Sequence, residues 1–381
     1  MEKRPVIGYD ASRISIKMKT GVEFYATQLF RGLQKVDTEH DYLVYTPSAS
    51  DPEFSNLAPH WKLRVIPMKY LWSQIRLALQ LTRDKPDFLF VPAAAMPFLT
   101  TTPVVTAIHD VAFWHFPESY SPFSRWYLDI ATRVAVKRAI HIVTISHSTK
   151  HDLIRLYDAD PEKISVIYLG FETGIEKKFL DNRTWSNISE KFGITKPYFV
   201  TVGRVERKKN VAQLVKAFYQ VLSAGHDMQL VIAGKSGHGY EEIKAIIDHY
   251  NIADRVVVTG YVTEEEKRYL MHYAKAFVFV PIAEGFGIPI LEAFAAGLPV
   301  VASDIPVFRE LYEGGVFFAK PRDTEMIAQQ MMLVIDRPER NREMQLRRRE
   351  IMQMFTWDQC TRGTYDLFKE VITALKERHQ P

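Results

Sequence analysis

Two glutamates, with seven residues between them, flank a glycine-rich turn in the second half of the chain. Glu284 and Glu292 bound the stretch EGFGIPILE, which follows the β-branched run AFVFVP at 276–281 and precedes Gly297. The pattern predicts a strand, a turn and a helix, with Glu292 about one turn inside the helix. A carboxylate accepts hydrogen bonds from two neighbouring hydroxyls, so sugars are its natural neutral partners.

The turn between the two glutamates favours close approach of a ligand to the backbone. Gly285 and Gly287 carry no side chain, and the amides at a helix start can point at an anion. Simpler roles stay open, since Glu284 can complement the helix dipole and Glu292 can lie on a helix surface. The residues on both sides of Glu292 are apolar, however, and a carboxylate in such a run needs a partner.

A second predicted strand end carries a group of cations. In TVGRVERKKN at 201–210, the strand ends at Gly203 and Arg204 and Lys209 follow, with two further cations between them. A helix is expected to begin near Asn210, a residue type that commonly caps helices. Cations beside a helix N-terminus favour binding of phosphate oxygens, although a solvated loop with incidental charge is an equally open interpretation.

Two weaker signals lie in the first half of the chain. His109 follows the strand pattern VVTAI at 104–108, where an imidazole can donate or accept a proton near neutral pH. A purely structural histidine is an equally good interpretation. Gly21 opens a helical pattern in MKTGVEFYATQLF at 18–30, and a glycine before a helix is common on its own.

The elements that must position these residues alternate along the whole chain. Amphipathic segments, such as 72–83 and 124–139, separate short apolar runs that read as strands. The predicted strands are 6–10, 42–46, 62–66, 87–92, 104–108, 141–146, 163–170, 198–203, 228–234, 255–260, 276–281, 299–303 and 315–319. This alternation predicts an α/β protein with two doubly wound parallel sheets, joined by a polar linker at 171–196. The Arg-rich segment 336–350 is expected to be a solvated helical face.

Composition excludes several classes of protein. The 381 residues are 47% hydrophobic and 25% charged, which fits a soluble chain of about two domains. The net charge is only +4 and no known nucleic-acid-binding motif is present, which argues against nucleic-acid binding. The mild positive charge is still compatible with contact with phosphates or a membrane surface. Cys360 is the single cysteine, and no segment has the character of a signal peptide or a membrane span, so we expect a cytoplasmic protein. No Cys/His group has zinc spacing.

Taken together, these motifs resemble the family 4 retaining glycosyltransferases of the GT-B fold. GRVERKKN is similar to the family's G-R-x-x-x-x-K-N segment, and EGFGIPILE is similar to its E-x7-E signature. Three further segments resemble the family's sequences at corresponding positions: IAGKSG at 232–237, GYV at 260–262 and FTWDQ at 355–359. The resemblance covers nearly the whole chain.

The resemblance implies a GT-B architecture, in which two Rossmann-like domains face a cleft. An N-terminal acceptor domain would span 1–180, and a C-terminal domain that binds the nucleotide-sugar donor would span 190–357. The last helix, 358–381, would cross back onto the N-terminal domain.

The resemblance also assigns roles to the candidate residues. Glu284 would meet the sugar hydroxyls near the reacting carbon, with His109 close to the donor sugar, so both are predicted catalytic residues. Glu292 would bind the nucleotide ribose. The other predicted donor-binding residues are Arg204 and Lys209 for the diphosphate, the backbone of Gly285, Phe286, Gly287 and Ile288, and Gly21 in a mobile loop.

The implied activity is transfer of a hexose from a nucleotide sugar, of GDP-mannose or UDP-glucose type, with retained anomeric configuration. HDVAFWHFPESY resembles bacterial mannosyltransferase text and favours mannose. The expected acceptor is a glycan, a lipid-linked molecule or a small molecule, with room for peripheral contact at the inner face of the membrane. Neither a metal nor a cofactor is expected. Two alternatives stay open, a nucleotide-sugar 2-epimerase of the same fold and a non-catalytic nucleotide-sugar-binding protein.

Overall fold

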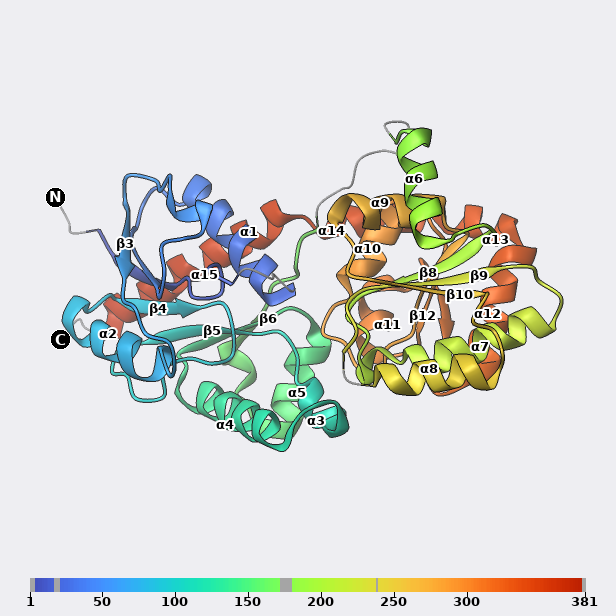
Figure 1. Ribbon diagram of the computed structural model, residues 1–381. Coiled ribbons are helices and arrows are strands. Elements are labelled where there is room, and N and C mark those ends of the chain that lie inside the picture. The colour runs from blue at the N-terminus through green and yellow to red at the C-terminus, as the bar shows by residue number, and fades with distance from the viewer. Residues whose placement is uncertain (1–3, 17–20, 172–179, 238, 379–381) are drawn as a thin grey trace. The chain divides into compact units, whose positions relative to one another are not determined.

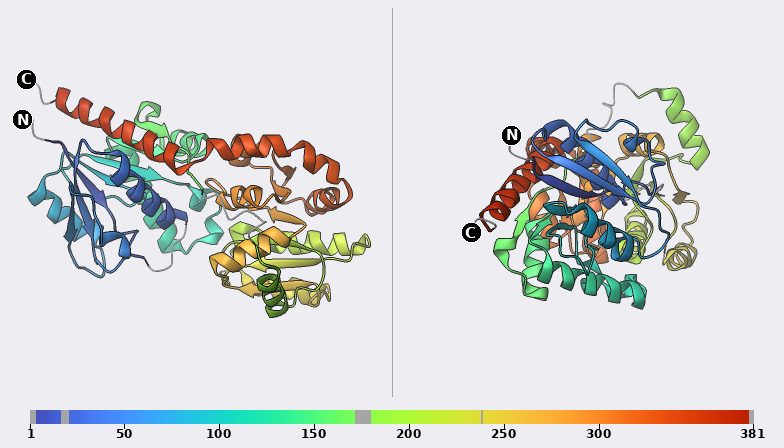
Figure 2. Two further views of the ribbon diagram at one scale, coloured as in Figure 1. Left: turned by 90° about the horizontal axis from the view of Figure 1, so that it is seen from above. Right: turned by 90° about the vertical axis from the view of Figure 1, so that its left-hand side faces the viewer.

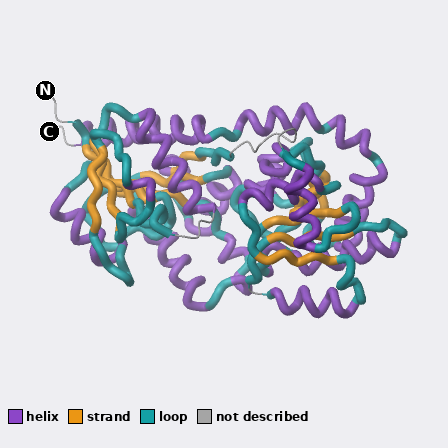
Figure 3. Tube along the Cα trace, turned by 45° about the horizontal axis from the view of Figure 1, so that its top comes forward, coloured by secondary structure: helices purple, strands orange, loops and turns teal. Residues whose placement is uncertain are grey.

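The structure is a computed structural model that describes residues 4–16, 21–171, 180–237 and 239–378. The chain divides into two compact units, and in each a parallel sheet is flanked by helices (Figure 3). The first unit comprises Met1–Trp114, Tyr120–Gly170 and Phe355–Pro381, and the second comprises His115–Ser119 and Phe171–Met354.

In the first unit, the described residues form a seven-stranded parallel sheet of order β3-β2-β1-β4-β5-β6-β7 (Figure 1). Its strands are β1 (Val6–Asp10), β2 (Asp41–Thr46), β3 (Trp61–Val65), β4 (Phe88–Val91), β5 (Val104–Ile108), β6 (His141–Thr144) and β7 (Ile164–Val166). Ile7 of β1 pairs with Tyr42 on one side and with Phe88 on the other. The strand order therefore reverses between β1 and β4, which makes that edge a topological switch point.

Helices cover both faces of this sheet, because its strands are apolar on both sides. The helices are α1 (Gly21–Val36), α2 (Ala78–Asp84), α3 (Ala112–His115), α4 (Pro122–Arg138), α5 (His147–Tyr157) and α15 (Trp357–Arg378). Short 3₁₀ or π segments are η1 (Pro52–Phe54), η2 (Ser73–Leu77) and η4 (Pro161–Lys163). The 3₁₀ segment η3 (Pro117–Ser119) belongs to the second unit. Buried residues of α2, α4 and α5, such as Leu81, Ala135 and Leu153, form one core with the strands.

The opposite face is covered by α1 together with the C-terminal helix α15, which lie side by side (Figure 2). The ring of Phe368 meets those of Phe88 and Phe90 edge-on, at 5.2 and 5.1 Å. A Cβ atom at Gly32 of α1 would lie 2.1 Å from Oγ1 of Thr361, so the two helices approach closely only because Gly32 has no side chain. The last helix thus completes the core of the first unit.

In the second unit, the described residues form a six-stranded parallel sheet of order β10-β9-β8-β11-β12-β13. Its strands are β8 (Tyr198–Val202), β9 (Gln229–Ala233), β10 (Val256–Gly260), β11 (Ala276–Phe279), β12 (Val300–Ser303) and β13 (Phe317–Ala319). Its helices are α6 (Asn182–Phe192), α7 (Val211–Ser223), α8 (Tyr240–His249), α9 (Glu264–Tyr273), α10 (Ile288–Ala295), α11 (Pro306–Tyr312), α12 (Thr324–Asp336), α13 (Pro338–Glu343) and α14 (Gln345–Met354), with the 3₁₀ segment η6 (Arg207–Lys209). Here β8 and β11 are neighbours, so the switch point lies between them.

The sequence predictions for the strands are confirmed. Each of the thirteen predicted runs overlaps one strand of the two described sheets. The largest difference is at β7, where 163–170 was predicted and Ile164–Val166 is observed. The predicted linker region contains α6, whose Trp185 stacks on Tyr273 at 4.4 Å, and the linker residues 172–179 lie outside the described residues.

The expectation that 336–350 is a solvated face is wrong at one position. Arg348 is only 4% exposed, its Nε donates to the Gly315 carbonyl at 2.7 Å, and its guanidinium lies over the Phe294 ring. Burial lowers the pKa of Arg348 to about 10. A buried arginine of α14 therefore packs against α10, the helix that carries Glu292.

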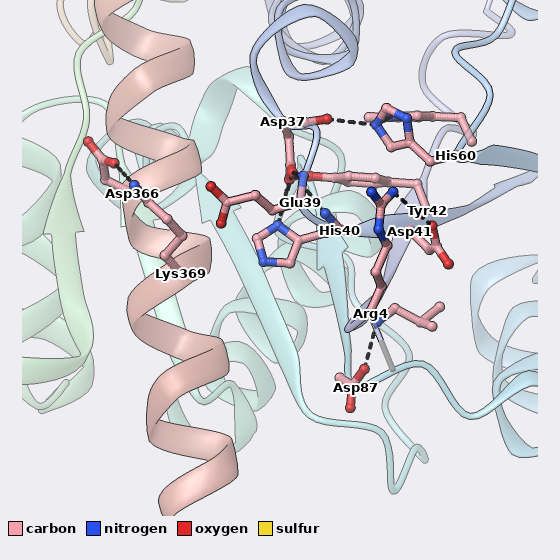
Figure 4. A network of polar contacts seen from close by, with 12 residues as sticks. Arg4, Asp37, Glu39, His40, Asp41, Tyr42, His60, Asp87, Asp366 and Lys369 are labelled. Carbon is pink, nitrogen blue, oxygen red and sulfur yellow. Dashed lines mark hydrogen bonds and ion pairs between the residues drawn. The ribbon is translucent and has the colours of Figure 1, made fainter. Parts of the chain in front are cut away.

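A buried polar network lies in the first unit, before β2 (Figure 4). The Asp37 carboxylate accepts from Nδ1 of His40 at 2.8 Å and from the Tyr42 hydroxyl, while Nε2 of His60 lies 2.6 Å from the Asp37 carbonyl oxygen. Burial raises the pKa of Asp37, but the hydrogen bonds from His40 and Tyr42 outweigh it and hold that pKa below its usual value. The network lies at the amino ends of the strands, away from the edge where ligands bind in such sheets.

Candidate functional site

The two strand-end loops singled out in the sequence are neighbours in the second unit. The loop after β8 contains Arg204 and Lys209, and the loop after β11 contains Glu284. Because β8 and β11 flank the switch point, both loops leave the sheet at the same place. A backbone hydrogen bond joins them, with the Ile282 amide donating to the Lys208 carbonyl at 2.9 Å.

A side-chain ion pair also joins these loops. Nζ of Lys209 lies 2.7 Å from Oε2 of Glu284, and both side chains are 18% exposed. The same ammonium lies 5.0 Å from the ring centre of Phe279, a cation–π arrangement. Because the pair is partly shielded from water, the attraction between the two charges is strong enough to hold both side chains in position. Both side chains still have exposed surface that a ligand can contact.

Asn210, the N-cap residue of α7, also connects the same loops through its side chain. Its side chain makes no capping hydrogen bond to α7. Instead, its Nδ2 donates to the carbonyls of Val280 at 2.9 Å and Pro321 at 2.6 Å, and its φ is +60°. Asn210 is therefore the N-cap residue of α7, as predicted, but its side chain is turned toward these two carbonyl groups and does not accept from the helix amides. Asn210 ties the start of α7 to the end of β11.

Arg204 is an exposed cation of the group. Its Nε lies 3.1 Å from Oε1 of Glu206, and its side chain is 66% exposed. An ion pair this open to water contributes little to stability. The guanidinium keeps its fork of donors at the carboxyl end of β8, where a phosphate group can accept from them.

The turn between the two glutamates is shaped by α11. The Tyr312 hydroxyl donates to the carbonyls of Phe286 at 3.0 Å and Gly287 at 3.2 Å. Burial, together with the charge of Glu284, raises the pKa of Tyr312 well above its usual value, so the phenol keeps its proton and stays a donor. Gly287 has a φ of +92°, and a Cβ there would lie 2.6 Å from Phe308. Only glycine fits this turn, which leads into α10 at Ile288.

Glu292 has the partner that its apolar neighbours demanded. Oε1 of Glu292 lies 2.9 Å from Nζ of Lys267, a residue of α9, and Lys267 also lies 2.7 Å from Oε2 of Glu264. Sequence reasoning missed Lys267, because it lies within a helix and is brought to Glu292 only by the packing of α9 beside α10. The one available signal was the need of a carboxylate in an apolar run for a cation.

His109 and Gly21 belong to the first unit. Nε2 of His109 donates to the Pro92 carbonyl at 3.1 Å, and its ring meets the Tyr25 ring of α1 edge-on at 4.8 Å. Burial lowers the pKa of His109, which favours the neutral imidazole with its proton on Nε2. Gly21 is the first residue of α1, and a Cβ there would meet no atom of the described residues within 4 Å.

The first unit also contains a cavity of about 470 Å³ at the carboxyl ends of β1 and β4. Its polar lining includes Asp10, Ser12 and Arg13, and Leu71 and Phe123 add exposed apolar surface. Burial raises the pKa of Asp10, although hydrogen bonds from Ser12 oppose the shift. The cavity lies at the switch point of its sheet, where doubly wound folds bind ligands.

Two further properties concern the part of the chain that the structure covers. Among the described residues, no three or more His, Cys, Asp or Glu side chains gather in a group suited to a metal ion. No described helix combines the length and the apolar character that crossing a membrane requires.

Comparison with a solved structure defines the class of fold. HepE from Anabaena, solved in complex with UDP and glucose, superposes with a TM-score of 0.74 at 20% sequence identity. The match covers 96% of this chain and 100% of HepE. The fold is therefore GT-B, the two-domain Rossmann-like architecture of many glycosyltransferases.

Sequence comparison defines the family. The model "Glycosyltransferase Family 4" matches residues 19–174, and the model "Glycosyl transferases group 1" matches residues 185–350. The chain belongs to these family 4-type glycosyltransferases, as the sequence motifs predicted.

Two relatives carry more specific names. The O-antigen chain mannosyltransferase RfbU of Salmonella typhimurium is 30% identical over 218 residues, which are 57% of this chain and 56% of RfbU. The O-antigen chain mannosyltransferase B of Escherichia coli is 26% identical over 292 residues, which are 75% of each chain. The alignment with RfbU thus spans little more than half of that relative's length.

Proposed function

We propose that this protein is a retaining, metal-independent hexosyltransferase that uses a nucleotide sugar of GDP-mannose or UDP-glucose type. The observation that carries the proposal is the Lys209–Glu284 pair at the switch point of the second sheet, with Arg204 in the same strand-end loop as Lys209. The names of RfbU and of mannosyltransferase B favour mannose, and the UDP and glucose in the HepE structure support the alternative donor.

Charge changes during transfer explain why cations and a carboxylate share one site. Breaking the bond between the anomeric carbon and the phosphate oxygen leaves negative charge on the nucleoside diphosphate. Lys209 and the backbone amide of Ile288, held by the ion pair and by the helix start, would stabilise this charge, and the exposed Arg204 would add a further donor. The anomeric carbon becomes positive, and Glu284 is the carboxylate suited to stabilise it. In this proposal, Glu292 binds the ribose.

Retention follows from a front-face route. An acceptor hydroxyl oxygen forms its bond to the anomeric carbon on the side from which the phosphate leaves, and its proton passes to the departing phosphate oxygen. The leaving group serves as the base, so the route needs no carboxylate nucleophile of the kind found in retaining glycosidases. His109, whose Nε2–H donates to the Pro92 carbonyl and whose lowered pKa keeps the imidazole neutral, would serve the reaction as a neutral polar group.

The acceptor would bind to the first unit, in the cavity lined by Asp10 and Arg13. A buried carboxylate suits sugar hydroxyls, and the arginine suits a phosphate. The exposed Leu71, Phe123 and Trp126, which are 63%, 73% and 59% exposed, offer apolar surface for a lipid-linked acceptor or for peripheral contact with a membrane.

A panel of nucleotide hexoses tests the proposal. The full chain is incubated with each donor and excess EDTA, and nucleoside diphosphate release is measured with and without candidate acceptors. We expect release with one or two donors, insensitivity to EDTA, and a product whose anomeric configuration, read by NMR, matches that of the donor. Inverted product would overturn the retaining route, and epimerised donor without an acceptor would favour an epimerase instead.

A further inference from the structure

The pair between Glu292 and Lys267 is part of a three-residue charge group shared by α9 and α10. Nζ of Lys267 lies 2.9 Å from Oε1 of Glu292 and 2.7 Å from Oε2 of Glu264. The three side chains differ in exposure, with Lys267 at 18%, Glu292 at 26% and Glu264 at 81%. The contact with Glu264 is therefore screened by water, whereas the contact with Glu292 is shielded and geometrically defined.

The electrostatics of Lys267 keep it a donor under all ordinary conditions. Burial lowers the pKa of Lys267, but the neighbouring carboxylates of Glu292 and Glu264 outweigh this and raise that pKa above its usual value. An ammonium has three donors and no acceptor, so its contact with Glu292 is a charge-assisted hydrogen bond in one direction only.

This contact fixes the direction in which Glu292 can accept further hydrogen bonds. A carboxylate has about four lone-pair sites on two oxygens, and Lys267 occupies one of them on Oε1. The buried residues Leu291 and Ala293, both 0% exposed, hold the backbone of α10 on either side. With the helix fixed by packing and one oxygen fixed by a lysine, the carboxylate plane has little freedom to rotate.

We propose that Lys267 is a positioning residue for nucleotide recognition, which holds the Glu292 carboxylate in the orientation that accepts hydrogen bonds from the ribose hydroxyls. The inference rests on the proposed role of Glu292 in donor binding. The inference gives helix α9 a role in the donor site, which the motifs at the strand ends do not indicate.

The test compares nucleoside diphosphates with their deoxy forms in each variant. Dissociation constants of GDP and UDP, and of their 2′-deoxy and 3′-deoxy forms, are measured by calorimetry for the full chain. For the nucleotide that binds, we expect removal of a ribose hydroxyl to weaken binding to the wild type about tenfold, as for a lost hydrogen bond to a charged group. The ratio of interest is the dissociation constant of the deoxy form divided by that of the parent nucleotide. In Lys267→Met this ratio should fall close to one, because the misoriented carboxylate no longer accepts hydrogen bonds from the hydroxyls.

Three further variants isolate the positioning role. Lys267→Arg retains a cation and should restore most of the ratio. Glu264→Gln changes the exposed neighbour and should leave the ratio unchanged. The double variant Lys267→Met/Glu292→Gln should bind no more weakly than Glu292→Gln alone, because both changes remove the same interaction. Where Lys267→Met lacks a cooperative melting transition, Lys267→Gln serves in its place.

The outcomes separate the inference from the function on which it rests. A wild-type ratio in Lys267→Met and Lys267→Gln, together with a ratio near one in Glu292→Gln, would overturn the role of Lys267 and leave the ribose role of Glu292 standing. A wild-type ratio in Glu292→Gln, or no discrimination by the wild type, would overturn both. Additive losses in the double variant would show that Lys267 acts independently of Glu292, which also contradicts the proposal.

Discussion

Two lysine–carboxylate pairs border the same turn, and they are built in different ways. Lys209 and Glu284 both come from loops at strand ends, whereas Lys267 and Glu292 both come from helices. The two pairs are similar in distance, 2.7 and 2.9 Å, and in the 18% exposure of their lysines. The pairs differ in the structure that holds them. The first pair lies in loops at the carboxyl ends of strands, where such folds bind ligands, and the second pair is held by helix packing. We therefore expect the first pair to act on the diphosphate and in the chemical step, and the second pair to act in binding of the ribose.

The largest effect is expected from Glu284→Gln. Loss of the negative charge opposite the developing positive charge should lower kcat for hexosyl transfer by about 10²–10³-fold, the magnitude typical of a removed electrostatic group at a reaction centre. Steady-state kinetics with a saturating donor measure it. Glu265→Gln, an exposed change on α9, is the matched control. Full activity of Glu284→Gln would remove the distinction between the two pairs.

The next effect concerns the turn that joins the pairs. Gly287→Ala introduces a Cβ at a φ of +92° and 2.6 Å from the Phe308 ring, so the turn must shift. We expect a loss of about 2–3 kcal/mol in the free energy of unfolding, from the strained φ and the overpacking together. Denaturant titration measures this loss. An unchanged unfolding midpoint would show that the turn adapts, and that it does not set the spacing of the pairs.

Glu292→Gln is expected to have a smaller and different effect. The amide still fills the space but forms a weaker bond with the ribose, so KM for the donor should rise about tenfold while kcat changes little. The same kinetic assay used for Glu284→Gln measures both constants. A fall in kcat with an unchanged KM would reverse the assigned division of roles.

The smallest effect is expected on the pH dependence of stability and concerns His109. Unlike the members of the two pairs, His109 contacts an uncharged carbonyl group. Because burial lowers the pKa of His109 in the folded protein, the unfolded chain binds a proton below about pH 6.5 that the folded chain resists. Stability should therefore fall as the pH drops from 7.5 to 5.5. His109→Gln should reduce that fall by up to about 1 kcal/mol, measured by denaturant unfolding at both pH values. An identical pH dependence in the two proteins would contradict a lowered pKa.

The positions of strands and of strand-end residues were predictable from the sequence. Near-continuous apolar runs identify buried parallel strands, and their carboxyl ends identify Arg204, Lys209 and Glu284 as candidates. Strand order was not readable, so the sequence could not show that β8 and β11 are neighbours and that Lys209 meets Glu284.

Contacts made by helix packing were not predictable in the same way. Asn210 is the cap residue that the sequence predicted, but the hydrogen bonds from its Nδ2 to two carbonyl groups near β11 and β13 were not predictable. Lys267 and Arg348 read as ordinary charged helix residues, and each is partly or fully buried against α10 or its neighbours. Local sequence patterns carry no information about which helices lie side by side, which is why these partners were missed.

Binding of the donor to Lys209→Met tests the central claim most directly. The donor selected by the panel is titrated calorimetrically into the wild type, into Lys209→Met and into Lys244→Met, a matched exposed lysine of α8. The account predicts binding to Lys209→Met at least about tenfold weaker than to the wild type, from loss of a charge-assisted contact with the diphosphate, and unchanged binding to Lys244→Met. Equal affinity of Lys209→Met and the wild type would contradict the placement of the donor diphosphate at the switch point of the second sheet.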